Sequence, residues 1–443
     1  MDAELRGARV LVLGLGMSGV SAARFCAGRG ARVVAAEESA RELDAAALGP
    51  GVELRVGAPF PDPAEFDLVV PSPGVPRARY AGRARRALGD VELAFRSLHV
   101  PIVAVTGTNG KSTTVRLVEA MLRAAGLRAE AAGNVGVPAL DLVGRPLDVA
   151  VLEVSSFQLE AVELFRPRVG VVLNVTDDHF DRHASLEAYA AAKARLFERQ
   201  QPDDVAIANG DDPLARKVAA AGRGRLALFQ RVGPVAEGAW WEGDAIALAE
   251  AGALERLPLD DVAGAPLPPR ENVLAALLAA RAAGADPRRA LRALVDFAGL
   301  PHRLERVAVR DGVAFVDDSK ATNPGAAEFA LDAQRAPVVW IAGGRDKELS
   351  FDALAESARG RVRRALLVGE AAGKLARALE GRVPYEVAGT VEAAVRRAAE
   401  VALPGDVVLL APACASFDQF KSYAERGERF RAAVLALGGE ERP

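Results

Sequence analysis

The most constraining stretch of this sequence is a glycine-rich segment, residues 106–113, which reads Thr-Gly-Thr-Asn-Gly-Lys-Ser-Thr. An apolar run from Val103 precedes it and predicts a buried strand. Apolar residues at helical spacing follow Lys111 and predict a helix that ends near Gly126. A strand, a glycine loop and a helix N-terminus with a lysine form a phosphate-binding arrangement, because backbone N–H groups, the helix dipole and the ammonium all favour an anion. We therefore expect a nucleoside triphosphate site made by Gly107, Thr108, Asn109, Gly110, Lys111, Ser112 and Thr113.

The spacing of this loop is unusual. Only two residues separate its two glycines, whereas the usual phosphate loop has four. The alternative is a glycine-rich turn that binds nothing. The Lys-Ser-Thr run favours a phosphate site, because the lysine falls where a charge is needed and Ser112 or Thr113 offers a hydroxyl to Mg²⁺.

Length and composition exclude several classes of protein. A chain of 443 residues suggests about three domains. Its formal charge of −3 argues against nucleic-acid binding by phosphate neutralisation. The two cysteines predict neither a disulfide framework nor a cysteine zinc site. The N-terminus does not resemble a signal peptide, and no run reaches the roughly 18 apolar residues of a membrane span. We expect a cytoplasmic protein.

The N-terminal region has a second glycine motif. A short apolar strand is followed by Gly14-x-Gly16-x-x-Gly19, a helix to about residue 29, and a second strand that ends at Glu37. This is half of a dinucleotide fingerprint. The motif alone leaves three alternatives open: a nicotinamide or flavin cofactor, another nucleotide, or tight packing without a ligand. A further strand from Asp67 runs into the loop of residues 72–75, and residues 1–98 are predicted to form one α/β domain.

The second predicted domain carries an acid inside an apolar strand. Glu153 interrupts the run from residue 148, and the segment Gly133–Gly136 follows another expected strand. A buried carboxylate is costly unless it is hydrogen-bonded or bound to metal. A structural, hydrogen-bonded Glu153 is one interpretation. The neighbouring phosphate loop favours a Mg²⁺ ligand, since Mg²⁺ prefers carboxylates together with phosphates and water.

Two histidines and an inward lysine follow. The exit loop of the next strand, residues 174–183, holds His179 and His183, two of only four histidines in the chain. Solvated loop residues are the alternative to a metal site. Residues 185–200 are predicted to form a helix, and Lys193 lies within its apolar stripe. A lysine there can extend its ammonium to solvent, but a lysine directed inward beside a metal loop is a candidate functional residue.

The rest of the sequence predicts hairpins at residues 225–265, helices at 272–284 and 291–298, and a domain boundary at 299–305. Strands starting near residues 313, 337, 362 and 406 alternate with helices and each end in polar loops, which predicts a parallel sheet with ligands at its carboxyl edge. The expected fold class is α/β in three domains: an N-terminal Rossmann-like domain, a central P-loop ATPase-type domain and a C-terminal Rossmann-like domain. Their predicted bounds are 1–98, 99–299 and 300–443.

Several motifs together resemble the Mur ligases, the ATP-dependent amide ligases of peptidoglycan precursor synthesis. The similar stretches lie in order along nearly the whole chain, and they are residues 106–113, 133–136, 152–159, 174–182, 300–303 and 317–323. The stretch at 412–421 is similar to that of the member that adds D-glutamate to UDP-N-acetylmuramoyl-L-alanine. The resemblance implies that reaction, with an acyl-phosphate intermediate, for this chain.

The resemblance also assigns residues. It implies that the first domain binds the UDP of the substrate rather than a nicotinamide, with contacts from Met17, Ser18, Glu37, Ser72, Gly74, Asn134 and His179. It implies two Mg²⁺ ions, held by Ser112 and Glu153 and by His179 and Lys193, the lysine being carboxylated on its Nζ by CO₂. It adds Asn272, Arg303, Asp318 and Lys320 to the ATP site. It implies D-glutamate binding by Thr322, Lys347, Ser416 and Tyr423. The expected partners are therefore these small molecules, with no nucleic acid, no membrane span and a monomeric chain.

The sequence departs from the family pattern at two positions, and three other functions are alternatives. Ala275 replaces an Asn that contacts adenine in relatives, and Tyr423 replaces a familiar Phe. The rivals are a sister ligase such as a folylpolyglutamate synthase, a regulatory nucleotide-binding protein without catalysis, and a nicotinamide oxidoreductase. Intact Lys111, Glu153, His179 and Lys193 argue against the regulatory alternative, because binding alone needs no second metal site.

Overall fold

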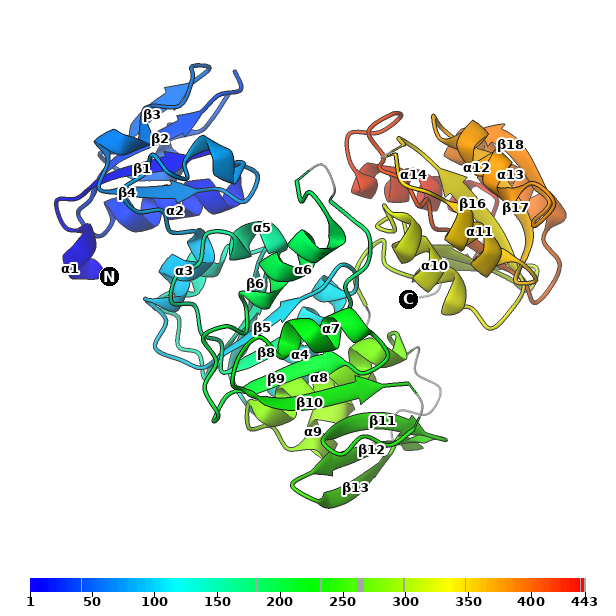
Figure 1. Ribbon diagram of the computed structural model, residues 1–443. Coiled ribbons are helices and arrows are strands. Elements are labelled where there is room, and N and C mark those ends of the chain that lie inside the picture. Colours follow the sequence, from blue (N-terminus) through cyan, green and yellow to red (C-terminus); the bar gives the residue numbers. More distant parts are fainter. Residues whose placement is uncertain are drawn as a thin grey trace. The chain divides into compact units, whose positions relative to one another are not determined.

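The structure is a computed structural model that describes residues 1–40, 42–179, 182–231, 233–260, 267–297, 299–346, 348–438 and 440–441. The chain divides into two compact units, Met1–Phe297 and Ala298–Pro443. The first unit contains two sheets and the second contains one. Figure 1 shows strands that alternate with helices in each unit. This confirms the predicted α/β class.

The first sheet is small and parallel. Its order is β3-β2-β1-β4, with Val10–Leu13 of β1 in the middle, and these residues are fully buried. Helix α2 packs one face of the sheet through Ala22, Ala23 and Cys26. The elements are α1 (Asp2–Leu5), β1 (Arg9–Leu13), α2 (Met17–Ala27), β2 (Arg32–Glu37), β3 (Glu53–Val56), β4 (Leu68–Pro71) and α3 (Asp90–Phe95).

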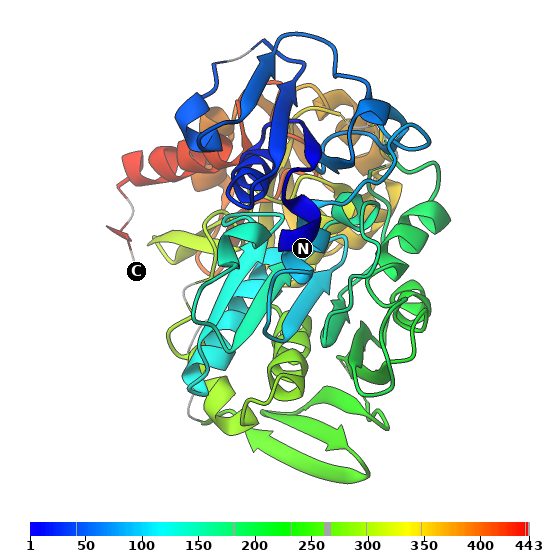
Figure 2. The same cartoon turned by 90° about the vertical axis from the view of Figure 1, so that its left-hand side faces the viewer.

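The second sheet has nine strands among the described residues, in the order β13-β12-β11-β10-β9-β8-β5-β7-β6. All neighbours from β6 to β11 are parallel, and β11 to β13 are antiparallel and form the end away from the first sheet (Figures 1 and 2). The strands are β5 (Ile102–Thr106), β6 (Ala129–Gly133), β7 (Val149–Glu153), β8 (Val169–Val172), β9 (Val205–Asn209), β10 (Arg225–Gln230), β11 (Gly238–Glu242), β12 (Ala245–Glu250) and β13 (Ala253–Pro258).

Helices cover both faces of this sheet, which explains why its central strands are apolar throughout. Helices α4 and α8 share one core with Val103 and Val105 of β5, whereas Tyr189 and Ala215, from α6 and α7, belong to the core on the other face. The helices are α4 (Lys111–Ala124), α5 (Ser156–Leu159), α6 (Leu186–Ala194), α7 (Pro213–Ala219), α8 (Arg270–Ala282) and α9 (Pro287–Leu291).

The second unit is a seven-stranded sheet with helices on both faces. Its order is β18-β17-β16-β19-β15-β14-β20, parallel from β18 to β15 and antiparallel beyond. Helices α10, α11 and α12 share one core and α13 and α14 the other. The elements are β14 (Glu305–Arg310), β15 (Val313–Asp317), α10 (Pro324–Asp332), β16 (Val338–Gly343), α11 (Asp352–Ala358), β17 (Val362–Val368), α12 (Ala372–Leu379), β18 (Tyr385–Gly389), α13 (Val391–Val401), β19 (Val407–Leu410), α14 (Tyr423–Ala436) and β20 (Glu440–Glu441).

The sequence predicted most of the strands, but several elements differ. The helix expected over residues 185–200 ends at Ala194, and the one expected at 291–298 lies at Pro287–Leu291 with a short 3-10 turn after it. Strand β10, expected in a hairpin, pairs in parallel with β9 and β11. Strands β3, β14 and β18 were not predicted, because all three are only partly buried and lack a strong apolar pattern.

The helices of the described residues include none that is both long and apolar enough to cross a membrane. Cys26 and Cys414 are buried free thiols.

Candidate active site

The phosphate loop lies at the carboxyl edge of the central sheet, between β5 and α4. Gly107 and Gly110 have φ values of 152° and 83°, which side chains disfavour. A methyl group on Gly110 would lie 3.0 Å from the side-chain oxygen of Asn272, so this asparagine lies against the loop. Helix α4 is 14 residues long, and no side chain caps its N-terminus. The positive end of the helix dipole therefore lies at this loop, which fits the predicted nucleotide.

Residues that follow β8, the strand next to β5, hold the phosphate loop in place. The side-chain oxygen of Asn174 accepts hydrogen bonds from the N–H groups of Thr108 at 3.0 Å and Asn109 at 2.8 Å. The Thr108 hydroxyl in turn accepts from the N–H of Thr176 at 3.0 Å. These bonds fix the loop in the shape that leaves the helix N-terminus open. The sequence places Asn174 in one of the family-like motifs but does not predict this role. Its position just after β8 is the feature that could have indicated it.

Two lysines meet on one carbonyl oxygen of this loop. The Nζ atoms of Lys111 and Lys193 both donate to the carbonyl of Gly107, at 2.8 and 2.9 Å. Lys193 reaches it from α6, is only 1% exposed, and lies 4.2 Å from the centroid of the Tyr189 ring. Lys193 is therefore directed inward, and the alternative of an ammonium extended to solvent is wrong.

The environment of Lys193 changes its chemistry. Burial lowers its pKa well below the usual value, and the charge of Lys111 lowers it further, against an opposing effect of Asp178. A buried ammonium is costly when no carboxylate is paired directly with it. Lys193 therefore has far more neutral amine at neutral pH than an ordinary lysine, and a neutral amine is the form that reacts with CO₂.

Glu153 lies at the same sheet edge as the phosphate loop. Strand β7 pairs with β5 so that Glu153 stands opposite Val105, one residue before the end of β5. The carboxylate is 3% exposed and accepts a hydrogen bond from the Asn134 side chain at 2.9 Å. Asn134 therefore lies next to Glu153. Carboxylate, hydroxyl and phosphate oxygens are the ligands that Mg²⁺ prefers, so Glu153 and Ser112 fit this ion.

His179 reaches the site from the loop after β8. It has a left-handed φ of 57°, and its ring lies 4.9 Å from that of Phe157 and 6.0 Å from that of Tyr189, measured between centroids. Asp178 accepts its backbone N–H at 2.9 Å. The second histidine has a different role: His183 is buried, and its Nε2 is hydrogen-bonded to Ser156 at 3.0 Å. Of the two clustered histidines, only His179 remains a metal-ligand candidate.

The first glycine motif forms the loop between β1 and α2 of the N-terminal sheet. Gly19 lies so close to the loop that an added Cβ would be 1.9 Å from the carbonyl oxygen of Gly14. The Ser72 hydroxyl donates to that same carbonyl at 2.6 Å, and the Glu37 carboxylate accepts the N–H of Leu15 at 3.0 Å. The exposed Met17 opens helix α2, whose N-terminus is capped by no side chain. The motif, Ser72 and Glu37 are therefore assembled around one loop.

Ser18 and Gly74 extend this region. Ser18 is hydrogen-bonded to Asp90, a buried carboxylate that also accepts from Gln158 of helix α5 at 3.0 Å. Burial raises the pKa of Asp90. Gly74 lies in the loop after β4, where an added Cβ would meet nothing within 4 Å. Asp90 was not singled out from sequence, because no motif surrounds it.

The second unit brings another group of the assigned residues together. The Lys320 ammonium lies 3.8 Å from the centroid of the Tyr423 ring. Asp318 is buried, which raises its pKa to about 7 against the lowering effect of Arg303. Ser416 is 2% exposed and follows β19 closely, and Thr322 precedes α10. Lys347 lies outside the described residues.

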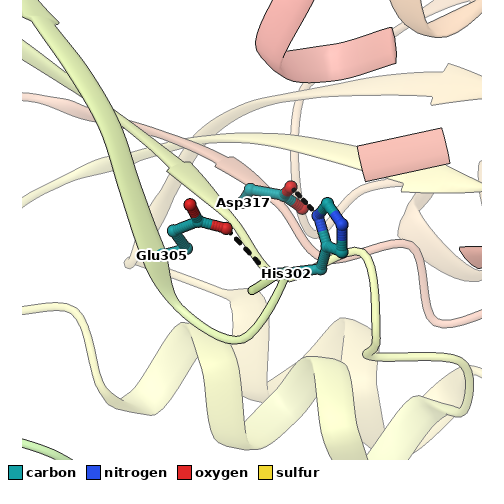
Figure 3. A group of neighbouring side chains, drawn as sticks. All are labelled: His302, Glu305 and Asp317. Carbon is teal, nitrogen blue, oxygen red and sulfur yellow. Dashed lines mark hydrogen bonds and ion pairs between the residues drawn. The ribbon is translucent and has the colours of Figure 1, made fainter. Parts of the chain in front are cut away.

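The turn that carries Arg303 is held by a three-residue group, drawn in Figure 3. His302 Nδ1 is 2.7 Å from a carboxylate oxygen of Asp317, and Glu305 accepts the N–H of His302 at 2.8 Å. Their potential ligand atoms lie within 4.8 Å of one another. The hydrogen bond to Asp317 raises the pKa of His302. His302 and Leu304 both have left-handed φ values, so the group holds a strained turn.

Ala275, the departure in helix α8, is fully buried in the core against the central sheet. Its small side chain packs there and offers no polar group.

This combination of a phosphate loop, a buried lysine and a carboxylate on one parallel sheet is typical of ATP-dependent ligases, and comparison with known proteins agrees. Residues 105–282 match the Mur ligase middle domain, and residues 302–414 match the Mur ligase glutamate ligase domain. The chain belongs to the Mur ligase family.

Relatives named UDP-N-acetylmuramoylalanine--D-glutamate ligase extend over the whole chain. The protein from Geobacter metallireducens is 42% identical over 99% of this chain and 100% of its own. The one from Anaeromyxobacter dehalogenans is 49% identical over 97% of each chain. A solved structure of MurF ligase from Thermotoga maritima in complex with ADP has a similar fold, with a TM-score of 0.59 at 19% identity over 99% of this chain and 97% of its own.

Proposed function

We propose that this chain is an ATP-dependent ligase that joins the carboxyl group of UDP-N-acetylmuramoyl-L-alanine to the amino group of D-glutamate. The observation that carries the ligase chemistry is the meeting of Lys111 and Lys193 on the Gly107 carbonyl, beside Glu153 at the next strand exit. The choice of substrates rests on relatives of that name at 42% and 49% identity over nearly the full chain.

The reaction needs ATP because a carboxylate does not react with an amine at neutral pH. Transfer of the γ-phosphoryl group to the carboxylate gives an acyl phosphate and ADP. The amine of D-glutamate then attacks the acyl carbon and releases phosphate, which leaves an amide. Negative charge is spread over the transferred group, so cations and fixed donors are what the protein must supply. Lys111 and the N-terminus of α4 meet this need.

Two Mg²⁺ ions would be held by the residues around the loop. Ser112 and Glu153 fit the first ion, and His179 with a carboxylated Lys193 fits the second. The neutral amine of Lys193 adds to CO₂ and loses a proton, which gives a carbamate with oxygen ligands. This change also replaces a costly buried ammonium by an anion next to Lys111. The ions, when bound, neutralise phosphate charge and orient the reacting oxygens.

We assign the substrates to three domains, 1–98, 99–299 and 300–443, each of which contains one of the three sheets. The UDP substrate is assigned to the first glycine loop and its neighbours, Met17, Ser18, Glu37, Ser72, Gly74, Asn134 and His179. ATP is assigned to residues 107–113 and Asn272, with Arg303, Asp318 and Lys320. D-Glutamate is assigned to Thr322, Lys347, Ser416 and Tyr423. The proposal includes a monomer in the cytoplasm, where free thiols such as Cys26 and Cys414 persist.

Phosphate release from ATP tests this function directly. The full chain is incubated with ATP, Mg²⁺ and UDP-N-acetylmuramoyl-L-alanine, and D-glutamate is compared with L-glutamate, L-alanine and meso-diaminopimelate. We expect turnover with D-glutamate alone. Turnover with another amino acid would keep the ligase chemistry and move the substrate assignment. ATP binding without turnover for every pair would favour a regulatory protein, and a change in NAD(P)H fluorescence on titration would favour an oxidoreductase.

A further inference from the structure

Arg426, on helix α14, is an arginine buried where no sequence motif predicted a functional residue. It is 1% exposed and is among the largest fully buried side chains of the described residues. Burial lowers its pKa to about 10, so it remains charged at neutral pH. A buried guanidinium must be compensated by several acceptors. The identity of those acceptors indicates what Arg426 does.

The acceptors of Arg426 are one hydroxyl and three carbonyl oxygens, and they come from two strand exits. Its Nε donates to the Ser319 hydroxyl at 2.9 Å, and Nη2 donates to the Ser319 carbonyl at 2.8 Å. Both Nη atoms lie 3.2 Å from the carbonyl oxygen of Cys414, and Nη1 lies 3.3 Å from that of Ala415. Ser319 follows β15, and Cys414 and Ala415 follow β19, its parallel neighbour.

The loop after a third strand, β16, also reaches the Arg426 guanidinium. The Ala415 carbonyl also accepts the N–H of Arg345 at 2.8 Å, in the loop after β16. Gly344 lies so close that an added Cβ would be 2.3 Å from the Ala415 oxygen and 3.0 Å from Nη1 of Arg426. Strands β16, β19 and β15 are adjacent in the sheet. One guanidinium therefore lies where three neighbouring strand exits converge.

These loops carry the residues assigned to D-glutamate. Ser416 follows Ala415 directly, and Thr322 is three residues after Ser319. The Ser319 hydroxyl, which accepts from Arg426, donates to the carbonyl of Tyr423 at 2.8 Å. Tyr423 is thus linked to Arg426 through the Ser319 hydroxyl, and Ser416 and Thr322 lie one and three residues along the chain from acceptors of Arg426.

We propose that Arg426 is a positioning residue that holds Ser416, Thr322 and Tyr423 in the geometry needed to bind D-glutamate. The inference rests on the proposed function, because it assumes that these residues bind that amino acid. A planar guanidinium can donate to acceptors on several loops at once, whereas a lysine ammonium offers one point charge. Arg426→Lys would keep the positive charge and lose the planar set of N–H donors that reaches several loops.

The test compares Arg426→Lys with the same change at Arg429, an exposed arginine on the same helix that pairs with Glu392. In the full chain we expect Arg426→Lys to raise the KM for D-glutamate by about tenfold or more, while the KM for the UDP substrate stays within about twofold. Arg429→Lys is expected to change neither value. A merely structural role would lower the amount of active protein, and so Vmax, without a selective change in one KM.

A second variant covers the case in which Arg426→Lys does not fold. Ser319→Ala removes the hydroxyl between Arg426 and Tyr423, and we expect it to raise the D-glutamate KM about threefold. Folded variants with an unchanged D-glutamate KM, or with equal increases for D-glutamate and the UDP substrate, would overturn the inference alone. Absence of D-glutamate turnover in the unsubstituted chain would overturn the proposed function, and this inference with it.

Discussion

At the scale of single residues, burial explains most of the unusual chemistry of this chain. Lys193 is buried, donates to the Gly107 carbonyl and lies against the Tyr189 ring. A residue held this way in a stable fold is costly, so a function that uses the neutral amine is the simplest account. Carboxylation would convert the same side chain into a metal ligand.

Replacing Lys193 by alanine should therefore abolish ligase activity and leave the fold intact. We expect turnover to fall by at least about a hundredfold, because ligands that stabilise transition-state charge have effects of this size. Thermal unfolding should show a folded protein, and short carboxylates such as acetate should restore part of the activity. Lys217→Ala, on exposed helix α7 surface, is the control. Full activity of Lys193→Ala would exclude the second-metal role.

Asp318 predicts a pH dependence of stability. Its folded pKa is about 7, raised by burial, against 3.8 as the reference. Between these values the folded state retains a proton that the unfolded state has released, so stability falls as pH rises from about 4 to 7. The Asp318→Asn side chain cannot ionise. Between pH 5 and pH 8 the Tm of this variant should therefore fall by about 5 °C less than the Tm of the unsubstituted chain. Asp311→Asn, at an exposed position, should lose as much Tm with rising pH as the unsubstituted chain. The same change of Tm with pH in both variants and the unsubstituted chain would contradict the role of Asp318.

At the scale of elements, close packing of helices on loops determines where ligands can approach. Helix α2 lies against the loop after β1 because Gly19 has no side chain, and the Ser72 hydroxyl fills the remaining space beside Gly14. The third glycine of the motif therefore serves helix–loop packing, and the loop itself is left to the ligand.

Gly19→Ala should separate α2 from this loop. A Cβ 1.9 Å from the Gly14 oxygen cannot be accommodated without a shift, and we expect a loss of about 2 kcal/mol together with a higher KM for the UDP substrate. Gly16→Ala is the matched control for stability in the same motif, since an added Cβ there meets nothing within 4 Å. Urea unfolding measures the loss of stability, and substrate titration measures the KM of Gly19→Ala. Equal loss of stability in the two variants would refute the packing argument.

At the scale of the whole molecule, the residues that we assign to ATP come from both compact units. Lys111, Glu153 and Lys193 belong to Met1–Phe297, whereas Arg303, Asp318 and Lys320 belong to Ala298–Pro443. The assignment of the second set is therefore tested by substitution and not by the arrangement of the units.

Nucleotide binding measures the contribution of Lys320. We expect Lys320→Ala to weaken the binding of a non-hydrolysable ATP analogue to the full chain, because the substitution removes a cation assigned to the phosphates. Isothermal titration calorimetry in the presence of Mg²⁺ and the UDP substrate gives the affinity. An unchanged affinity for the analogue would mean that Lys320 does not contact the nucleotide.

The sequence by itself determined the α/β class and the principal candidate residues around the phosphate loop. The reason is physical: phosphate binding needs a strand, glycines, a lysine and a helix in one contiguous segment, and a buried parallel strand needs a continuous apolar run. Gly107, Gly110 and Lys111 can therefore be recognised without any distant partner. The inward direction of Lys193 could not be settled in this way, because a lysine in an apolar stripe can equally extend its ammonium to solvent.

Only the tertiary structure decided which distant groups meet. The shared Gly107 carbonyl joins residues that are 82 positions apart in the chain, 111 and 193, and no local pattern encodes that contact. The same holds for Asn174 on the phosphate loop, for the separation of His179 from the buried His183, and for Arg426 between strand exits. These contacts depend on strand order and on the direction in which each helix packs, which arise from burial of the whole core rather than from any one segment.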